Sequence, residues 1–135
     1  MTIVTDSKTR RRDIILSPNK SLISQKLINL IKKYETQHQV QVQTIKADKG
    51  TELINKPLKQ FIEDKGIRVE LTGTQSKPEH GIAERANDLV ERITRFLIKD
   101  SGLSKRYWPF AAETAIYILN RCHSRSIRSM FLFRR

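Results

Sequence analysis

The sequence is short of cysteine and of long apolar segments, and each shortage excludes a class of protein. Cys122 is the only cysteine in 135 residues, so neither a disulfide framework nor a cysteine-based zinc site is expected. No run of 18 apolar residues occurs, so no membrane-spanning helix is expected. The first residues lack the charged flank and apolar stretch of a signal peptide. These absences favour a protein of a reducing compartment, either the cytosol or the nucleus.

Acidic residues are also scarce relative to basic ones. The chain has 14 aspartates and glutamates against 26 lysines and arginines, which gives a formal net charge of +12. A charge of this size favours an anionic partner, and nucleic acid is the commonest one. A basic solubilising surface is the alternative, and composition alone does not separate the two. Without internal repeats or a Pro-, Gly- or Ser-rich linker, the chain is expected to form one compact domain.

The periodicity of apolar residues predicts a mixed α/β domain. Strands are expected at 2–5, 14–16, 40–45 and 67–71. Helices are expected to start at the capping residue Ser21, at Pro57, after a polar loop over 72–80, and near Tyr107. Strands first, then alternating helices and strands, and then two helices are typical of an α/β architecture. The buried stripe expected for the long third helix consists of Ile82, Ala86, Leu89, Val90, Ile93, Phe96 and Leu97.

Three carboxylates occupy positions that suit a metal site. Asp6 and Asp48 each end an expected strand, where open α/β sheets usually place their ligands. Glu84 lies near the start of the long helix, on a face turned away from its buried stripe. Such oxygen ligands suit Mg²⁺, which keeps several waters and takes further ligands from phosphate. The spacing itself proves little, because the 35 residues between Asp48 and Glu84 also separate Glu52 from Asp88 and Asp64 from Asp100.

Each acid also has a purely structural interpretation. Asp6 would cap a turn, Asp48 would stabilise the Asp-Lys-Gly turn, and Glu84 would be a solvated acid favoured by the helix dipole. Spacing and placement leave both interpretations open.

Two longer motifs resemble those of copia-type LTR-retrotransposon integrases. The segment 45–52 (Ile-Lys-Ala-Asp-Lys-Gly-Thr-Glu) resembles their second-aspartate motif. The segment 80–87 (His-Gly-Ile-Ala-Glu-Arg-Ala-Asn) is similar to their glutamate motif and is the more specific match. Residues 6–10 resemble the first-aspartate motif more weakly, and 101–108 resembles a downstream helical region. The resemblance runs in register from about Thr2 to Arg128.

This resemblance implies an RNase H-like fold, with a mixed central sheet flanked by helices. It implies a polynucleotidyl transferase that carries out 3′-end processing and strand transfer of retroelement DNA. Asp6, Asp48 and Glu84 would be catalytic and would hold two Mg²⁺ or Mn²⁺ ions, one activating the nucleophile and one stabilising the leaving oxygen. Implied partners are retroelement DNA ends, target DNA and further copies of the chain, with no membrane. The implied location is the nucleus, with a cytoplasmic particle stage.

Basic residues beside the expected metal site are candidate DNA contacts, with solvated surface charge as the alternative interpretation. They are Lys49, Lys77, His80 and Arg85. Family members usually carry a basic residue where this sequence has Asp88, and an acid there repels the DNA backbone. DNA binding along that helix face is therefore expected to be weak.

Other features depart from the family pattern. The N-terminal His/Cys zinc domain and the C-terminal extension of a full integrase are not found, and Asp13 replaces a large aromatic residue. A charge at that place costs packing unless it faces solvent. We therefore expect a truncated catalytic core over 1–128 and an aberrant basic and apolar tail over 129–135. The alternatives are a non-catalytic, basic nucleic-acid-binding remnant of a decayed retrotransposon polyprotein, and a small interaction domain whose acids are incidental.

Overall fold

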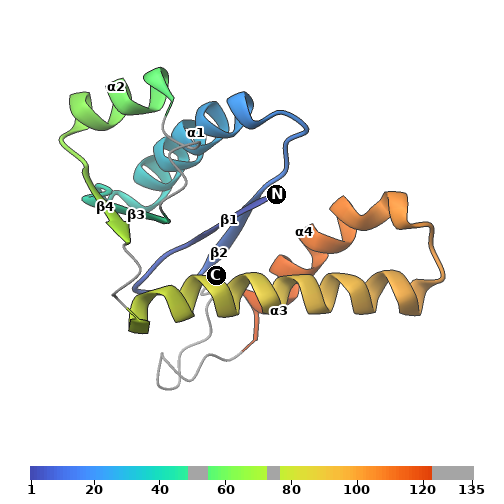
Figure 1. The fold of residues 1–135 in the computed structure, drawn as a ribbon. Coiled ribbons are helices and arrows are strands. Elements are labelled where there is room, and N and C mark those ends of the chain that lie inside the picture. The colour runs from blue at the N-terminus through green and yellow to red at the C-terminus, as the bar shows by residue number, and fades with distance from the viewer. Residues whose placement is uncertain (49–54, 73–76, 123–135) are drawn as a thin grey trace. The chain divides into compact units, whose positions relative to one another are not determined.

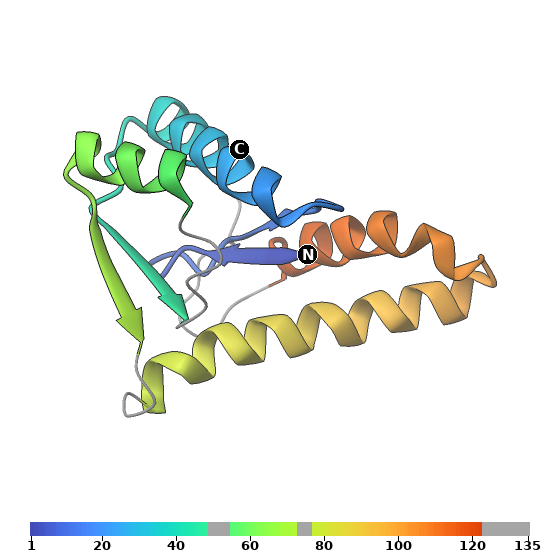
Figure 2. The same ribbon diagram turned by 45° about the horizontal axis from the view of Figure 1, so that its top comes forward.

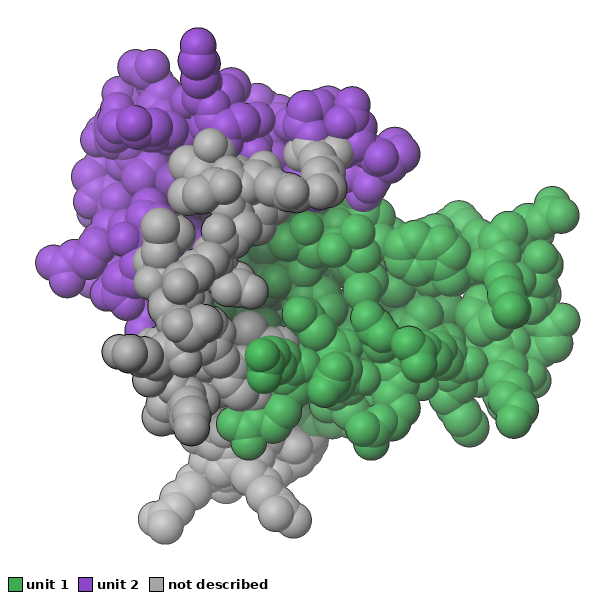
Figure 3. All heavy atoms as spheres, in the orientation of Figure 1, with its two compact units in different colours: residues 1–16, 81–135 green, residues 17–80 purple. Residues whose placement is uncertain are grey.

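The structure, a computed structural model, describes residues 1–48, 55–72 and 77–122 (Figure 1). The chain divides into two compact units. Unit 1 combines Met1–Leu16 with Gly81–Arg135, and unit 2 is the continuous segment Ser17–His80 (Figure 3). Each unit is described by itself below. The tail expected over 129–135 lies outside the described residues.

Unit 1 packs a β-hairpin against two helices. Strand β1 (Thr2–Thr5) pairs antiparallel with β2 (Arg12–Ile15), with Ile3 opposite Ile14. Helix α3 (Lys77–Ser101) is followed by a short 3-10 turn, η2 (Lys105–Tyr107), and by α4 (Trp108–Leu119). The buried cluster consists of Val90, Ala115, Ile116 and Leu119, and Ile3, Ile14, Leu89, Ile93 and Leu97 pack against it. The same residues that give the hairpin its apolar face therefore join it to both helices.

The burial of Phe96 and of Asp13 bears on two expectations drawn from the sequence. Phe96, expected in the buried stripe of α3, is 64% exposed. It precedes Leu97 by one residue, and one residue turns a helix by about 100°, so only Leu97 reaches the cluster. Asp13 is half-buried and lies 3.6 Å from the Arg11 guanidinium, which offsets part of the cost of its charge within the strand.

Asn120 ties the end of α4 to β2 through both halves of its side-chain amide. Its Oδ1 accepts a hydrogen bond from the Arg12 N–H at 2.9 Å, and its Nδ2 donates to the Arg12 carbonyl at 2.7 Å. Asn120 is only 8% exposed, so these bonds satisfy polar groups that water does not reach easily.

We expect Asn120→Ala to lower the free energy of unfolding by about 1–3 kcal/mol, because it leaves a buried donor and acceptor of Arg12 without partners. Urea denaturation followed by circular dichroism measures the loss. Asn120→Asp is the matched variant: it keeps an acceptor for the Arg12 N–H but cannot donate to the carbonyl when ionised. Wild-type stability in both variants would contradict the assigned role.

Unit 2 is a β-α-β segment preceded by a long helix. Helix α1 (Lys20–His38) leads to β3 (Thr44–Asp48), α2 (Lys56–Lys65) and β4 (Arg68–Thr72). Strands β3 and β4 are parallel, with Thr44 opposite Arg68 and Asp48 opposite Thr72. The buried cluster is Ile28, Leu58, Ile62 and Ile67, with Leu27, Val42, Ile45, Phe61 and Val69 packed against it.

Local hydrogen bonding explains where these elements begin and end. For α2 the expected start is confirmed, because Pro57 lies in the first turn. The Asn55 side chain caps the helix by accepting from the Leu58 N–H, and Gly66 ends it at φ 65°. For α1 the expected cap was wrong by two residues. Asn19 caps this helix by accepting from the N–H of Ser21, which lies inside it.

The largest differences from the expected boundaries are at the starts of β3 and α3. Strand β3 begins at Thr44 rather than Val40, because Gln39 in the left-handed region ends α1 and the next residues form a connection. Helix α3 begins at Lys77, inside the expected polar loop. Pro78 then falls in its first turn, where a missing N–H has no intrahelical partner to lose.

The strands contain both kinds of pairing expected of a mixed sheet. Among the described residues, β1 is hydrogen-bonded to β2 and β3 to β4, giving one two-stranded sheet in each unit. Helices and strands alternate along the chain as the sequence predicts (Figure 2). Within the part of the chain that the structure describes, none of the helices is long and apolar enough to cross a membrane.

Candidate functional site

Asp6 follows β1 directly, and its carboxylate closes the β1–β2 turn. It accepts hydrogen bonds from the Thr9 N–H at 2.8 Å, from the Thr9 hydroxyl, and from the Lys8 N–H at 3.4 Å. Backbone bonds at 2.9 Å from Asp6 N–H to the Arg11 carbonyl and from Arg10 N–H to the Asp6 carbonyl complete the turn. Asp6 therefore has a definite structural role, whatever else it binds.

The hydrogen bonds of the turn also change the acidity of Asp6. Partial burial on its own raises the pKa of this carboxyl, but the bonds from Thr9 and Lys8 outweigh it and hold the pKa below its usual range. Because the pKa is lower in the folded chain than in the unfolded one, ionised Asp6 stabilises the fold above its unfolded pKa of about 3.9. That contribution is lost as the pH falls through the folded value.

We expect Asp6→Ala to lower the free energy of unfolding by about 1 kcal/mol at pH 7, since the turn N–H groups lose their acceptor. The difference from wild type should shrink as the pH falls below about 4 and vanish below the lower pKa of the folded carboxyl, where Asp6 is neutral in both states. Chemical denaturation at pH 7 and in acid tests this, with Thr9→Val as the partial variant. A difference that stays constant with pH would rule out the carboxylate as its source.

Glu84 lies near the beginning of α3 and is exposed. Ala86 and Val90, which lie on the opposite side of the helix, are 2% and 0% exposed, so burial of that stripe turns Glu84 outward. The exposed face continues with Asp88, Glu91 and Arg95, the last two joined by an ion pair at 2.9 Å. Glu84 is thus an outward-facing carboxylate on a well-anchored helix.

The carboxyl end of β1 and the first turns of α3 lie toward the same end of unit 1. Ile3 packs against the cluster that contains Val90, and β1 and α3 run in opposite directions in both ribbon views (Figures 1 and 2). Asp6 lies three residues after Ile3, about 10 Å along a strand. Glu84 lies six residues before Val90, about 9 Å along a helix. Both steps lead away from this shared cluster in the same direction.

Asp48 is the last residue of β3 and pairs with Thr72 at the end of β4. The backbone thus has the expected strand-end position, whereas the Asp48 side chain and all of Lys49 lie outside the described part of the chain. Asp48 belongs to unit 2, and Asp6 and Glu84 belong to unit 1. Among the described residues, no group of three or more His, Cys, Asp or Glu is arranged to hold a metal ion.

The basic residues expected beside the site are described to different degrees. Arg85 is exposed on α3, next to Glu84. Lys77 and His80 lie in the first turn of α3, where the structure describes the backbone but not these side chains. Asp88 is exposed one turn after Glu84, so the acid expected to repel DNA does face solvent.

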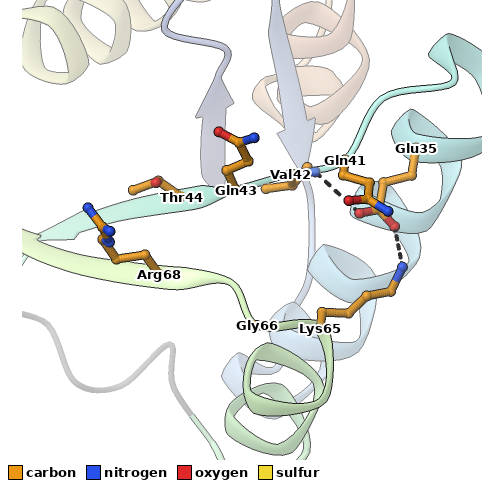
Figure 4. A pocket seen from close by; sticks show the side chains of 8 residues that line it. All are labelled: Glu35, Gln41, Val42, Gln43, Thr44, Lys65, Gly66 and Arg68. Atoms are coloured by element: carbon orange, nitrogen blue, oxygen red, sulfur yellow. Dashed lines mark hydrogen bonds and ion pairs between the residues drawn. The ribbon is translucent and has the colours of Figure 1, made fainter.

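A pocket that the sequence did not predict lies in unit 2, beside the start of β3 (Figure 4). Lys65 Nζ is 2.7 Å from Glu35 Oε2, and the Val42 N–H donates to Glu35 Oε1 at 3.3 Å. The ion pair with Lys65 lowers the pKa of the Glu35 carboxyl, with a further contribution from the bond to Val42. These contacts hold the connection after α1 in place, and the charge of the Glu35 carboxylate is balanced by Lys65. Its lining consists of Glu35, Gln41, Val42, Gln43, Thr44, Lys65, Gly66 and Arg68.

The sequence is similar to part of a retrotransposon polyprotein. No protein-family model matches the chain. Over 80 residues the chain is 30% identical to the retrovirus-related Pol polyprotein from transposon TNT 1-94 of Nicotiana tabacum. The match covers 59% of this chain and 6% of the polyprotein, so the chain corresponds to a small part of that relative.

The fold is similar to that of the catalytic core domain of HTLV-2 integrase, solved in complex with magnesium in a trimeric form. The TM-score is 0.65, and the match covers 90% of this chain and 73% of that one. At 14% sequence identity the likeness concerns the fold. The α/β, RNase H-like fold class expected from the sequence is confirmed.

Proposed function

We propose that this chain, which is related to the Pol polyproteins of copia-type retrotransposons and has the fold of an integrase catalytic core, is a polynucleotidyl transferase core for DNA integration. Its reactions would be 3′-end processing and strand transfer of retroelement DNA. The observation that carries the proposal is Glu84: it is an exposed carboxylate near the start of α3, inside the segment that resembles the integrase glutamate motif.

The proposed metal ligands are Asp6, Asp48 and Glu84. Their carboxylate oxygens are donors that hard divalent cations prefer, and the related fold was solved with magnesium. When bound, two Mg²⁺ or Mn²⁺ ions supply Lewis-acid activation of the attacking oxygen and charge stabilisation at the leaving oxygen. Glu84 fits this role without change, because its carboxylate faces solvent. Asp48 fits by its position at the end of a strand.

Asp6 fits the metal site less simply. Its carboxylate accepts bonds from Thr9 and Lys8 within the turn, although each carboxylate oxygen has more than one lone pair. A metal ion at Asp6 would therefore have to share an oxygen with the turn or displace its bonds. Titrating Asp6→Asn and Glu84→Gln with Mg²⁺ or Mn²⁺ tests whether Asp6 is a metal ligand or only a turn residue. If only Glu84→Gln binds the metal more weakly than wild type, Asp6 is not a ligand.

For the remaining contacts, we place the DNA backbone near Lys49, Lys77, His80 and Arg85. These residues border the segments that carry Asp48 and Glu84, and a formal charge of +12 supports an anionic partner. Several copies of the chain would act together, as the trimeric form of the related core suggests. The expected place of action is the nucleus, after a cytoplasmic particle stage.

A second candidate function is a nucleic-acid-binding remnant without catalysis. Two observations favour it: the Asp6 carboxylate is used by the turn, and the acidic Asp88 is exposed beside Glu84. The remnant would keep the fold and the basic charge, and it would lack metal-dependent chemistry.

The test is a strand-transfer assay on branched DNA with Mg²⁺ or Mn²⁺, run beside a DNA-binding measurement at several salt concentrations. Metal-dependent cutting or joining supports the transferase. Salt-sensitive DNA binding without any reaction supports the remnant. A chain that binds neither divalent metal nor DNA would contradict both and leave an interaction domain.

A further inference from the structure

Helix α4 carries large aromatic side chains on the face opposite its buried one. Phe110 is 66% exposed and Tyr117 is 57% exposed. They lie seven residues apart, which is two helical turns or about 10 Å along one face. The buried side of the same helix consists of Ala112, Ala115, Ile116 and Leu119. The core of unit 1 therefore does not account for the two exposed rings.

Two contacts extend this face in both directions. The Tyr107 ring lies 6.3 Å from the Phe110 ring, centroid to centroid, with 43° between their planes. The Arg121 guanidinium lies over the Tyr117 ring, 3.3 Å from its centroid. We call Tyr107, Phe110, Tyr117 and Arg121 the aromatic stripe. It consists of two rings on the outer side of α4, one ring from η2 just before that helix, and one planar cation just after it.

Basic residues lie close to the aromatic stripe along the sequence. Lys105 and Arg106 are exposed directly before Tyr107. Glu113 is the only acid within α4, and it is exposed on the same face, three residues after Phe110 and four before Tyr117. The sequence after Arg121 adds four arginines and no acid. Exposed rings interleaved with basic side chains are how proteins bind single strands, with bases stacking on the rings and phosphates lying near the cations.

We propose that the aromatic stripe binds single-stranded DNA by stacking bases on Phe110 and Tyr117. A net charge of +12 favours a polyanion, and a duplex keeps its bases stacked on each other, which makes a single strand the better match for exposed rings. The choice of DNA rests on the proposed function, whereas the stacking surface does not involve the metal site. Arg121 adds a planar cation on which a base can also stack.

The test uses a single-stranded thymidine oligonucleotide with EDTA present, so that no metal-dependent reaction contributes. Trp108 is the only tryptophan in the chain, is 43% exposed, and directly follows Tyr107, so its fluorescence reports binding at this end of the stripe. We expect the oligonucleotide to quench Trp108. We also expect Phe110→Ala or Tyr117→Ala to weaken binding by about fivefold to about a hundredfold, the range for losing one stacked base.

Matched variants separate stacking from general hydrophobic contact. Phe110→Tyr keeps an aromatic ring and should bind within about twofold of wild type, whereas Phe110→Leu keeps apolar bulk without a ring and should bind as weakly as Phe110→Ala. Binding of a duplex should be unchanged in all of them. Because these side chains are exposed, circular dichroism should show the same fold in each variant.

Three results would overturn the proposal. They are unquenched Trp108 fluorescence at saturating oligonucleotide, unchanged affinity in the Phe110→Ala, Tyr117→Ala double variant, and full affinity in Phe110→Leu. Self-association that the double variant abolishes, with DNA affinity intact, would assign the stripe to a second copy instead. If single-strand binding fails these tests while metal-dependent strand transfer is observed, the proposed function stands and the role of the stripe does not. If strand transfer is absent while the binding results are as expected, the role of the stripe stands and the proposed function does not.

Discussion

Replacing Glu84 by glutamine is expected to lower metal-dependent strand transfer by at least about a hundredfold. Glutamine has nearly the same shape but no charge, so it holds a divalent cation much more weakly. Metal catalysis contributes several kcal/mol, and each 1.36 kcal/mol changes the rate tenfold. Rates measured at saturating DNA, with Mg²⁺ and then with Mn²⁺, give the size of the loss.

The chain supplies a close control for this variant one turn further along α3. Asp88 is also an exposed carboxylate on α3, so Asp88→Asn removes the same charge from the same helix. We expect Asp88→Asn to leave strand transfer intact. It should strengthen DNA binding slightly, because it removes a negative charge that repels the phosphates of the DNA backbone. Equal losses in the two variants would indicate a general charge effect, and full activity of Glu84→Gln would remove Glu84 from the site.

Neither variant should change folding. Glu84 lies outside both buried clusters and is exposed, and surface substitutions of this kind usually change stability by less than about 0.5 kcal/mol. Thermal unfolding of both variants checks this directly. If a variant loses activity but unfolds at the same temperature as wild type, the loss comes from the catalysed reaction and not from unfolding.

Leu58→Ala should have the largest effect on stability. Leu58 is 2% exposed and belongs to the buried cluster with Ile28, Ile62 and Ile67. Truncation removes apolar contacts and leaves a cavity, which costs about 2–5 kcal/mol for a buried leucine. A domain is stable by only about 5–15 kcal/mol, so we expect a clear shift of the urea midpoint.

Leu22 is the matched control for Leu58. It is also a leucine of unit 2, on α1, but it is 49% exposed. Leu22→Ala should cost less than about 1 kcal/mol, because little apolar surface returns to water. If the two variants shifted the midpoint equally, the burial of Leu58 would not be the source of its stabilisation.

Local chemistry made much of the fold predictable from the sequence. Helix α2 shows this best: its start was predicted from Pro57 alone, and its cap at Asn55 and its end at Gly66 are likewise set by neighbouring backbone groups. Strand β1 and the break at Gly102, where φ is 65°, are likewise local. The start of α1 was missed by two residues because Asn19 and Ser21 are both good caps, and only the hydrogen bond decides between them.

Longer-range features were not predictable in the same way. The Asn120–Arg12 bonds join residues 108 apart in the sequence, and no local pattern indicates such a contact. The exposure of Phe96 depends on which neighbouring residue of α3 faces the hairpin. For the site, the sequence predicted the strand-end position of Asp48 and the outward face of Glu84. It left the use of the Asp6 carboxylate open, because that depends on the fold of the turn.

Unit 1 is assembled from the two ends of the described chain, with all of unit 2 lying between them in the sequence. A two-stranded hairpin alone is at best marginally stable in water, so β1 and β2 gain lasting stability only when α3 and α4 are available to cover them. During synthesis, unit 2 therefore has all its own contacts before unit 1 does. The carboxylates of Asp6 and Glu84 come into one unit only when the final helix has been made, so the proposed site would be incomplete in a partly synthesised chain.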